Sequence, residues 1–272
     1  MGAARDFALG VTFVDGTGQV LSNGGRVMKN VTGYDLVKLM SGSWGTLGVL
    51  TEVALKVLPV SETQVTLKVH VTTWADAVGC MSAALGTPFD VSGAATVQAA
   101  EGGFDSLIRI EGFETSVQYR ASELTQRLAK FGTVDVVGDP WAEVKDLRAW
   151  AALDTVWRIS VRPTDSLKVI ELMQDLQQDR GFHCQLDWGG GLLWLGLEAA
   201  QMADTRAGLA LHQALQRHVA QLRGHATLVT SGLLRDQELC HFQPLERAIE
   251  RVSQSLREKF DPRGILNPGR MR

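Results

Sequence analysis

The sequence has little cysteine, and its cysteines are poorly spaced for shared chemistry. Cys80, Cys184 and Cys240 stand far apart in 272 residues, and no CxxC pair occurs. A disulfide framework or an iron–sulfur cluster needs an even or closely spaced set, so neither is predicted. The two His–Cys steps, at residues 183–184 and 240–241, put adjacent side chains on opposite faces of a strand, where they cannot share an ion. We expect no metal site.

Long apolar runs and an excess of positive charge are also missing. No run approaches the roughly 20 apolar residues of a membrane span, and residues 1–15 lack the basic-then-apolar order of a signal peptide. The 27 Lys and Arg residues face 30 Asp and Glu residues, for a net charge of -3. Because no basic stripe matches a phosphate backbone, nucleic acid is not an expected partner. A hydrophobic content of 45% instead predicts a globular protein of the cytoplasm without a transmembrane segment.

What is present begins with a hairpin and a glycine-rich stretch. Apolar runs between Phe7 and Leu21 flank the turn residues Asp15–Gly18, which predicts a β-hairpin. A short helix is expected at residues 34–40, and a strand at 49–58 that Pro59 closes.

Further along, the order of elements indicates a duplication. The first round is expected at 64–71, 74–86, 93–99, 105–112, 117–131 and 133–137, in the order strand, helix, strand, strand, helix, strand. A second round is expected at 155–162, 165–180, 182–188, 191–198, 203–223 and 225–230. Two such units can join edge to edge into one antiparallel sheet with helices on one face and the other face left for a partner layer. A last helix is expected at 243–259.

Three motifs suggest a function. The chain reads KNVTGYDL from Lys29 to Leu36, GSWGTLGVLTE from Gly42 to Glu52 and FDPRGILNPGR from Phe260 to Arg270. A single glycine-rich stretch is typical of a tight turn before a strand. Together and in this order, the motifs resemble those of FAD-linked oxidases with the vanillyl-alcohol-oxidase, or PCMH-type, fold, and most specifically the FAD-binding subunits of bacterial glycolate oxidases.

The resemblance implies an α+β fold in three parts. Residues 1–61 correspond to the C-terminal portion of a PCMH-type FAD-binding domain, residues 62–259 to a duplicated ferredoxin-like cap domain with an antiparallel sheet, and residues 260–272 to a tail that returns to the FAD-binding domain. The match begins in the middle of the flavin domain. Because about a hundred residues of a typical domain, including the pyrophosphate loop, are expected upstream, Met1 is expected to be an internal start or the chain a fragment.

The resemblance also implies the cofactor site. Glycines at 42, 45 and 48 let the main chain approach a flat ring, and exposed amides can donate to its oxygens. The residues that correspond to the FAD contact of the family are Trp44, Gly45, Thr46, Leu47, Gly48, Val49 and Leu50, with Asn30, Tyr34 and Asn267 near the flavin. Trp44 departs from the Glu, Gln or small residue that is common there.

Four polar residues beside the motifs have two interpretations each. Thr51 and Glu52 either anchor the loop by hydrogen bonds or are ordinary outward-facing strand residues. Lys29 and Lys38 either offset phosphate or flavin charge or, as is usual for isolated lysines, are solvated. No catalytic residue is identified.

By resemblance, the function is that of a glycolate oxidase FAD-binding subunit, which supports oxidation of glycolate, a small 2-hydroxy acid, to glyoxylate. The H-x-G-D-G-N-x-H and E-x-x-H-G motifs of related dehydrogenases are absent, so a sister flavin subunit is expected to perform the main substrate chemistry and an iron–sulfur subunit to take electrons onward. Contact with the inner membrane face, if any, would come through this complex. Two alternatives stay open: a non-catalytic scaffold without flavin, and a stand-alone oxidase of another hydroxy acid or alcohol.

Overall fold

The structure is a computed structural model that describes residues 2–27, 33–234 and 239–271. The chain forms two compact units, residues 1–60 with 244–272 and residues 61–243. Each unit has its own hydrophobic core. The expected cap range, 62–259, included the last helix, which the structure groups with the first unit because Phe260 packs against Phe13 with ring centroids 6.0 Å apart.

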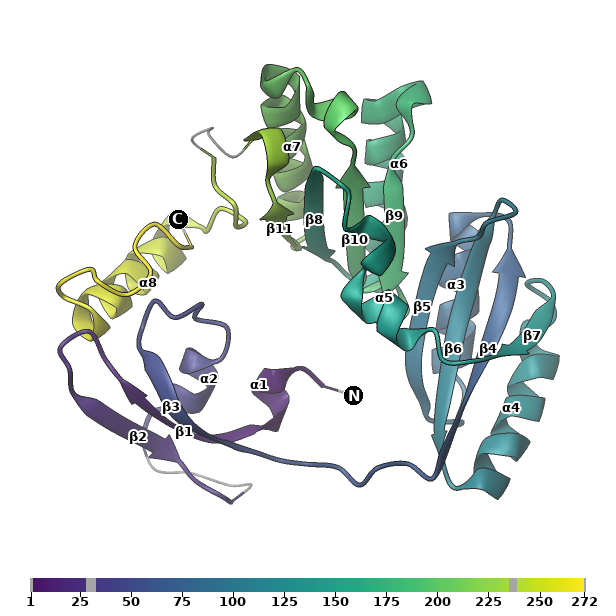
Figure 1. The fold of residues 1–272 in the computed structure, drawn as a ribbon, viewed down its shortest axis with the longest axis horizontal. Coiled ribbons are helices and arrows are strands. Elements are labelled where there is room, and N and C mark those ends of the chain that lie inside the picture. The colour runs from purple at the N-terminus through teal and green to yellow at the C-terminus, as the bar shows by residue number, and fades with distance from the viewer. Residues whose placement is uncertain (1, 28–32, 235–238, 272) are drawn as a thin grey trace. The chain divides into compact units, whose positions relative to one another are not determined.

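The first unit is a three-stranded antiparallel sheet with short helices (Figure 1). Its strands are ordered β2-β1-β3. The Phe13 ring is fully buried in a core with Val37, Met40 and Leu47. The elements are α1 (Ala4–Phe7), β1 (Ala8–Val14), β2 (Val20–Gly24), α2 (Leu36–Met40), β3 (Val49–Leu55) and α8 (Arg247–Phe260).

The predicted hairpin forms, and Asp15 holds its turn. The Asp15 carboxylate accepts hydrogen bonds from the main-chain N–H groups of Thr17 and Gln19 and from the Thr17 hydroxyl. The Thr17 hydroxyl and these amides lower the pKa of Asp15. Gly18 has a φ of 88°, which a glycine adopts without steric cost.

The second unit is an eight-stranded antiparallel sheet in the order β11-β8-β10-β9-β5-β6-β4-β7. Each half repeats one βαββαβ topology, and the halves meet where Thr96 of β5 pairs with Leu186 of β9. The first half contains β4 (Thr63–Val71), α3 (Trp74–Leu85), β5 (Val91–Gln98), β6 (Phe104–Gly112), α4 (Glu114–Leu128) and β7 (Val134–Val137). The second contains β8 (Thr155–Ser160), α6 (Ser166–Gln177), β9 (His183–Asp187), β10 (Leu192–Leu197), α7 (Thr205–Gln221) and β11 (His225–Thr230). The duplicated α+β unit expected from element order is confirmed.

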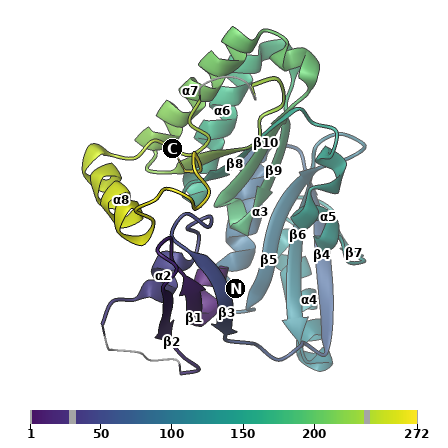
Figure 2. The ribbon, with the colours of Figure 1, turned by 60° about the vertical axis from the view of Figure 1, so that its left-hand side comes forward.

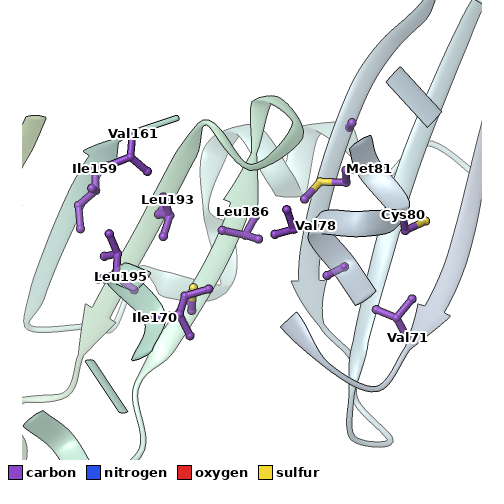
Figure 3. Close-up of a cluster of buried hydrophobic side chains, with 14 of the residues drawn as sticks. Val71, Val78, Cys80, Met81, Ile159, Val161, Ile170, Leu186, Leu193 and Leu195 are labelled. Atoms are coloured by element: carbon purple, nitrogen blue, oxygen red, sulfur yellow. The ribbon is translucent and has the colours of Figure 1, made fainter. Parts of the chain in front are cut away.

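One face of the sheet is covered by α3, α4, α6 and α7 (Figure 2). The close-up in Figure 3 shows side chains of both halves in one continuous core, among them Val78, Leu186 and Leu193. Burial raises the pKa of the Cys80 thiol in this core to about 12, so Cys80 packs as an apolar residue.

A short helix covers part of the opposite face, the face expected to be left for a partner layer. The helix α5 (Trp141–Asp146) packs on it, with Val144 against Ala95 and Leu107. The Trp141 indole donates to the Thr66 hydroxyl, and the Gln185 amide donates to the carbonyl of Val144. Short 3-10 turns complete the unit: η1 (Arg148–Trp150), η2 (Pro163–Asp165), η3 (Gln178–Arg180), η4 (Trp188–Gly190), η5 (Ala199–Met202) and η6 (Gly232–Leu234).

Candidate functional site

The loop between α2 and β3 is built from tight turns. The N–H of Ser43 donates to the carbonyl of Met40, and the N–H and hydroxyl of Thr46 both donate to the carbonyl of Ser43. Three residues have positive φ angles, Gly42 at 86°, Trp44 at 53° and Gly45 at 70°. A tryptophan in the left-handed region is rare, and such strain clusters at functional sites.

The C-terminal tail folds back on itself in a similar way. The Asp261 carboxylate accepts from the N–H of Leu266 at 2.7 Å, and the N–H of Gly264 donates to the carbonyl of Asp261. Asn267 has a φ of 43°, a conformation that asparagine tolerates better than most residues. The N–H of Arg270 then donates to the carbonyl of Asn267, which closes a last turn.

Loop and tail meet at Trp44. The Asn267 Nδ2 atom donates to the Trp44 carbonyl at 2.7 Å, across 223 positions of sequence. The Arg270 guanidinium carbon lies 5.2 Å from the centroid of the Trp44 ring, within cation–π range. A Cβ atom on Gly45 would lie 2.7 Å from Asn267 Nδ2, so glycine is required there for the close approach.

A pocket of about 470 Å³ lies at this junction. Its size matches a small-molecule site or one part of a larger cofactor. The main-chain N–H groups of Gly45 and Leu47 donate to no other group in the described part of the chain, which leaves two donors in the loop. The lining is mostly apolar or main chain: Met40, Gly42, Ser43, Trp44, Gly45, Gly48, Val49, Leu50, Ile265, Leu266 and Asn267.

The structure gathers six of the sequence-predicted site residues around this pocket, namely Trp44, Gly45, Gly48, Val49, Leu50 and Asn267. Thr46 and Leu47 instead line a neighbouring pocket of about 250 Å³. Tyr34 is 89% exposed and lines none of these pockets. Asn30 and Lys29 lie outside the described residues.

The structure describes three of the four polar residues that had two interpretations, namely Thr51, Glu52 and Lys38. The Thr51 hydroxyl donates to the carbonyl of Thr12 on β1, which supports the anchoring role. Glu52 lies exposed on β3, and the Lys38 ammonium donates to the carbonyl of Arg5.

Sequence comparison shows the family. The glycolate oxidase subunit GlcE of Escherichia coli strain K12 is 35% identical over 274 residues, which cover 99% of this chain and 66% of that protein. The chain belongs to the family of FAD-linked oxidases. The chain is also 44% identical over 66 residues to the glycolate oxidase subunit GlcD of Bacillus subtilis, covering 24% of this chain and 14% of GlcD. No family model matches.

Structural comparison shows the fold. The 4-ethylphenol oxidase of Gulosibacter chungangensis, solved with isoeugenol, superposes with a TM-score of 0.69 at 15% identity, over 97% of this chain and 65% of that one. The chain thus spans about two thirds of the length of these two proteins. In its described residues no helix has the length and hydropathy of a membrane span, and no three metal-ligating side chains gather.

Sequence reasoning missed the cation next to Trp44. Arg270 belongs to the tail motif, but nothing in its spacing shows that the tail turns at Asn267 and Gly269 and brings Arg270 against Trp44. Arg270 also lines a third pocket, of about 300 Å³, with Arg257 and Arg263. The sequence did contain one signal for this cluster of positive charge: arginines occur both in the last turn of α8 and in the C-terminal tail that follows it.

Proposed function

We propose that this chain is the FAD-binding portion of a glycolate oxidase subunit and that it holds the cofactor at the pocket between residues 42–50 and 265–267. The observation that carries the proposal is the junction itself. Two glycine-containing motifs far apart in sequence are joined by the Asn267–Trp44 hydrogen bond at one pocket.

The residues of the pocket suit a flat, partly polar ring system. Met40, Val49, Leu50, Ile265 and Leu266 supply apolar walls, and Val49 and Leu50 are 57% and 46% exposed. The rest of their unit leaves these apolar side chains uncovered. A ring that packs on them removes their apolar surface from water, which favours binding by about 25 cal/mol per Å² of apolar surface buried. The free amide of Gly45, which lines this pocket, is placed to donate to a ring oxygen.

FAD, when bound, supplies hydride acceptance and onward electron transfer, chemistry that belongs to the cofactor. The protein contributes position and charge. Asn267 fixes the orientation of the Trp44 peptide, and Arg270 places a positive charge beside the Trp44 ring. A positive charge beside the Trp44 ring favours the anionic over the neutral form of a group bound next to it.

The proposal extends to substrate and partners. The substrate is glycolate, which is oxidised to glyoxylate, and the partners are a sister flavin subunit and an iron–sulfur subunit. This is supported by the names of the relatives, which are glycolate oxidase subunits of two kinds, GlcE and GlcD. The absence of the metal- and carboxylate-binding motifs from the sequence supports a division of labour with a sister subunit.

The test is a pair of valine substitutions on one strand. Val49→Trp fills the pocket, whereas Val53→Trp adds the same ring to β3 at a site that is 45% exposed and lies outside the pocket lining. We expect Val49→Trp to abolish the visible absorbance of co-purifying flavin, while Val53→Trp keeps it. Equal flavin content in both variants would contradict the site.

A further inference from the structure

The second unit contains a half-buried arginine that has no counter-ion among the described residues. Arg158 lies on β8, with its guanidinium carbon 5.1 Å from the ring centroid of Trp188 and 6.0 Å from that of Trp194. No carboxylate of the described residues lies within 4.0 Å of it, and it makes no hydrogen bond there. Burial lowers the pKa of Arg158. Partly buried charges are ordinarily paired, so Arg158 lacks an expected partner in the part of the chain that the structure describes.

Arg109 shows what a satisfied arginine looks like in the same unit. Arg109 lies on β6, and its guanidinium carbon is 4.8 Å from the centroid of the Trp141 ring, so Arg109 also contacts an indole. Its Nε atom, however, is 3.0 Å from the Glu111 carboxylate, and its guanidinium donates to both the hydroxyl and the carbonyl of Ser92. Arg158 has the aromatic contact, but no carboxylate of residues 33–234 or 239–271 lies within 4.0 Å of it.

The neighbours of Arg158 on this face are suited to a small anion. In the antiparallel register Arg158 faces Trp194 on one side and Thr227 of β11 on the other. Side chains opposite each other in such pairs are about 5 Å apart at Cβ. The Thr227 hydroxyl makes no hydrogen bond to another described residue, so it is a second donor beside the guanidinium.

We propose that Arg158, Trp188, Trp194 and Thr227 form a binding site for a single carboxylate, and that its ligand is the carboxylate of a small 2-hydroxy acid. A guanidinium presents two parallel N–H donors in its plane, which match the two oxygens of a carboxylate. The single cation balances one negative charge and the hydroxyl adds a hydrogen-bond donor, whereas a phosphate dianion would need a further cation. The choice of a 2-hydroxy acid rests on the proposed function; the carboxylate class rests on the geometry alone.

The experiment measures binding to the full chain by the NMR signals of the tryptophan indole N–H and arginine Nε–H groups, without any requirement for flavin. Trp188→Phe and Trp194→Phe assign the two indole signals. Glycolate is titrated against glycolamide, its uncharged amide, at constant ionic strength. We expect saturable shifts at Trp188, Trp194 and Arg158 with glycolate and none with glycolamide.

Variants locate the charge. Because charge-assisted hydrogen bonds are worth about 1.5–3 kcal/mol, Arg158→Gln should weaken glycolate binding by about tenfold or more. Arg158→Lys keeps the positive charge but loses the two parallel N–H donors of the guanidinium, so it should weaken glycolate binding less than Arg158→Gln does. The control is Arg127→Gln, which removes an arginine that lies 5.3 Å from the Phe89 ring elsewhere in the unit and should leave binding unchanged.

Several outcomes overturn the proposal. They are the absence of saturable shifts in the unmodified chain, equal binding in Arg158→Gln, and equal binding of glycolamide. Tighter binding of N-acetylglutamate amide than of glycolate would show instead that the site takes an acidic side chain of a protein. Because flavin content is measured separately, a colourless chain that still binds glycolate at Arg158 would contradict the proposed function and leave this site standing.

Discussion

Asn267 combines a backbone role with a side-chain role. Its left-handed conformation, with a φ of 43°, turns the tail, and its Nδ2 atom reaches the Trp44 carbonyl at 2.7 Å. Few residue types combine a low cost in the left-handed region with a short side chain that carries a hydrogen-bond donor, and asparagine is one of them. The tail is therefore fixed to the loop by one side chain.

Two substitutions separate these roles. Asn267→Gly keeps the backbone conformation and loses the hydrogen bond, so it should lower the free energy of unfolding by about 1 kcal/mol. Asn267→Asp keeps the shape but turns an oxygen toward the Trp44 carbonyl oxygen, so it should cost more than Asn267→Gly and release flavin. Urea unfolding followed by tryptophan fluorescence measures the first effect. Greater stability of Asn267→Asp than of Asn267→Gly would contradict the contact.

The pocket residues could be predicted from sequence to different extents. Gly45, Val49 and Asn267 were predictable because they stand within motifs of a recognisable family. Tyr34 stands in a motif too, yet it is 89% exposed, because proximity along the chain to a motif does not fix where a side chain points. Arg270 and Arg158 were missed because both act through contacts with indoles that are distant in sequence.

At the scale of elements, α7 is held to the sheet by a polar contact inside the core. His212, only 1% exposed, lies beside Trp157 of β8 with ring centroids 6.5 Å apart. The Trp157 Nε1–H donates to His212 Nδ1 at 3.0 Å, and His212 Nε2 lies 3.0 Å from the Cys240 carbonyl oxygen, to which it donates. This pattern needs the neutral imidazole, since a proton on Nδ1 would remove the acceptor.

The pH dependence of stability follows from His212. Burial lowers the pKa of His212 in the folded state, so the unfolded chain takes up its proton first as pH falls. The stability that neutral His212 contributes is present above its unfolded pKa of about 6.5 and is lost as pH falls through the folded value. We expect His212→Gln to flatten the loss of unfolding free energy between pH 7.5 and 5.5, as measured by urea titration. The control is His225→Gln, at an exposed residue of β11, which should leave this loss of unfolding free energy unchanged.

The junction between the two halves of the sheet depends on Leu186. Its side chain is fully buried, lies beside Val78 in Figure 3, and its main chain pairs with Thr96. Leu186→Ala should lower the unfolding free energy by about 2–5 kcal/mol. Leu176→Ala, on α6 at 42% exposure, should cost about 0.5 kcal/mol or less. Similar losses in both variants would show that the halves are not joined through this core.

Most strands and helices were predictable from periodicity, because the long amphipathic segments leave little ambiguity. The helix α5 was not, because Trp141–Asp146 has only six residues and is placed by tertiary bonds, such as that between Trp141 and Thr66. The strand expected at 49–58 ends at Leu55 as β3. Pairing with β1 decides this end, since Leu55 is the last β3 residue with a partner there.

At the scale of the molecule, the two units have separate cores and separate chemistry. The second unit is continuous in sequence, residues 61–243, whereas the first is assembled from both ends of the chain. Residues 61–243 expressed by themselves should therefore fold and unfold in one cooperative transition, as measured by circular dichroism during heating. A chain of these residues without a cooperative transition would contradict the division.

The central claim concerns flavin binding, and visible absorption of the purified full chain tests it most directly. The sample is measured alone, then after co-expression with candidate partner subunits, beside Val49→Trp. The account predicts a flavin spectrum that depends on Val49 and on Asn267. A chain that stays colourless, and that adds no flavin to the complex beyond what the partners hold, would contradict it and favour a scaffold.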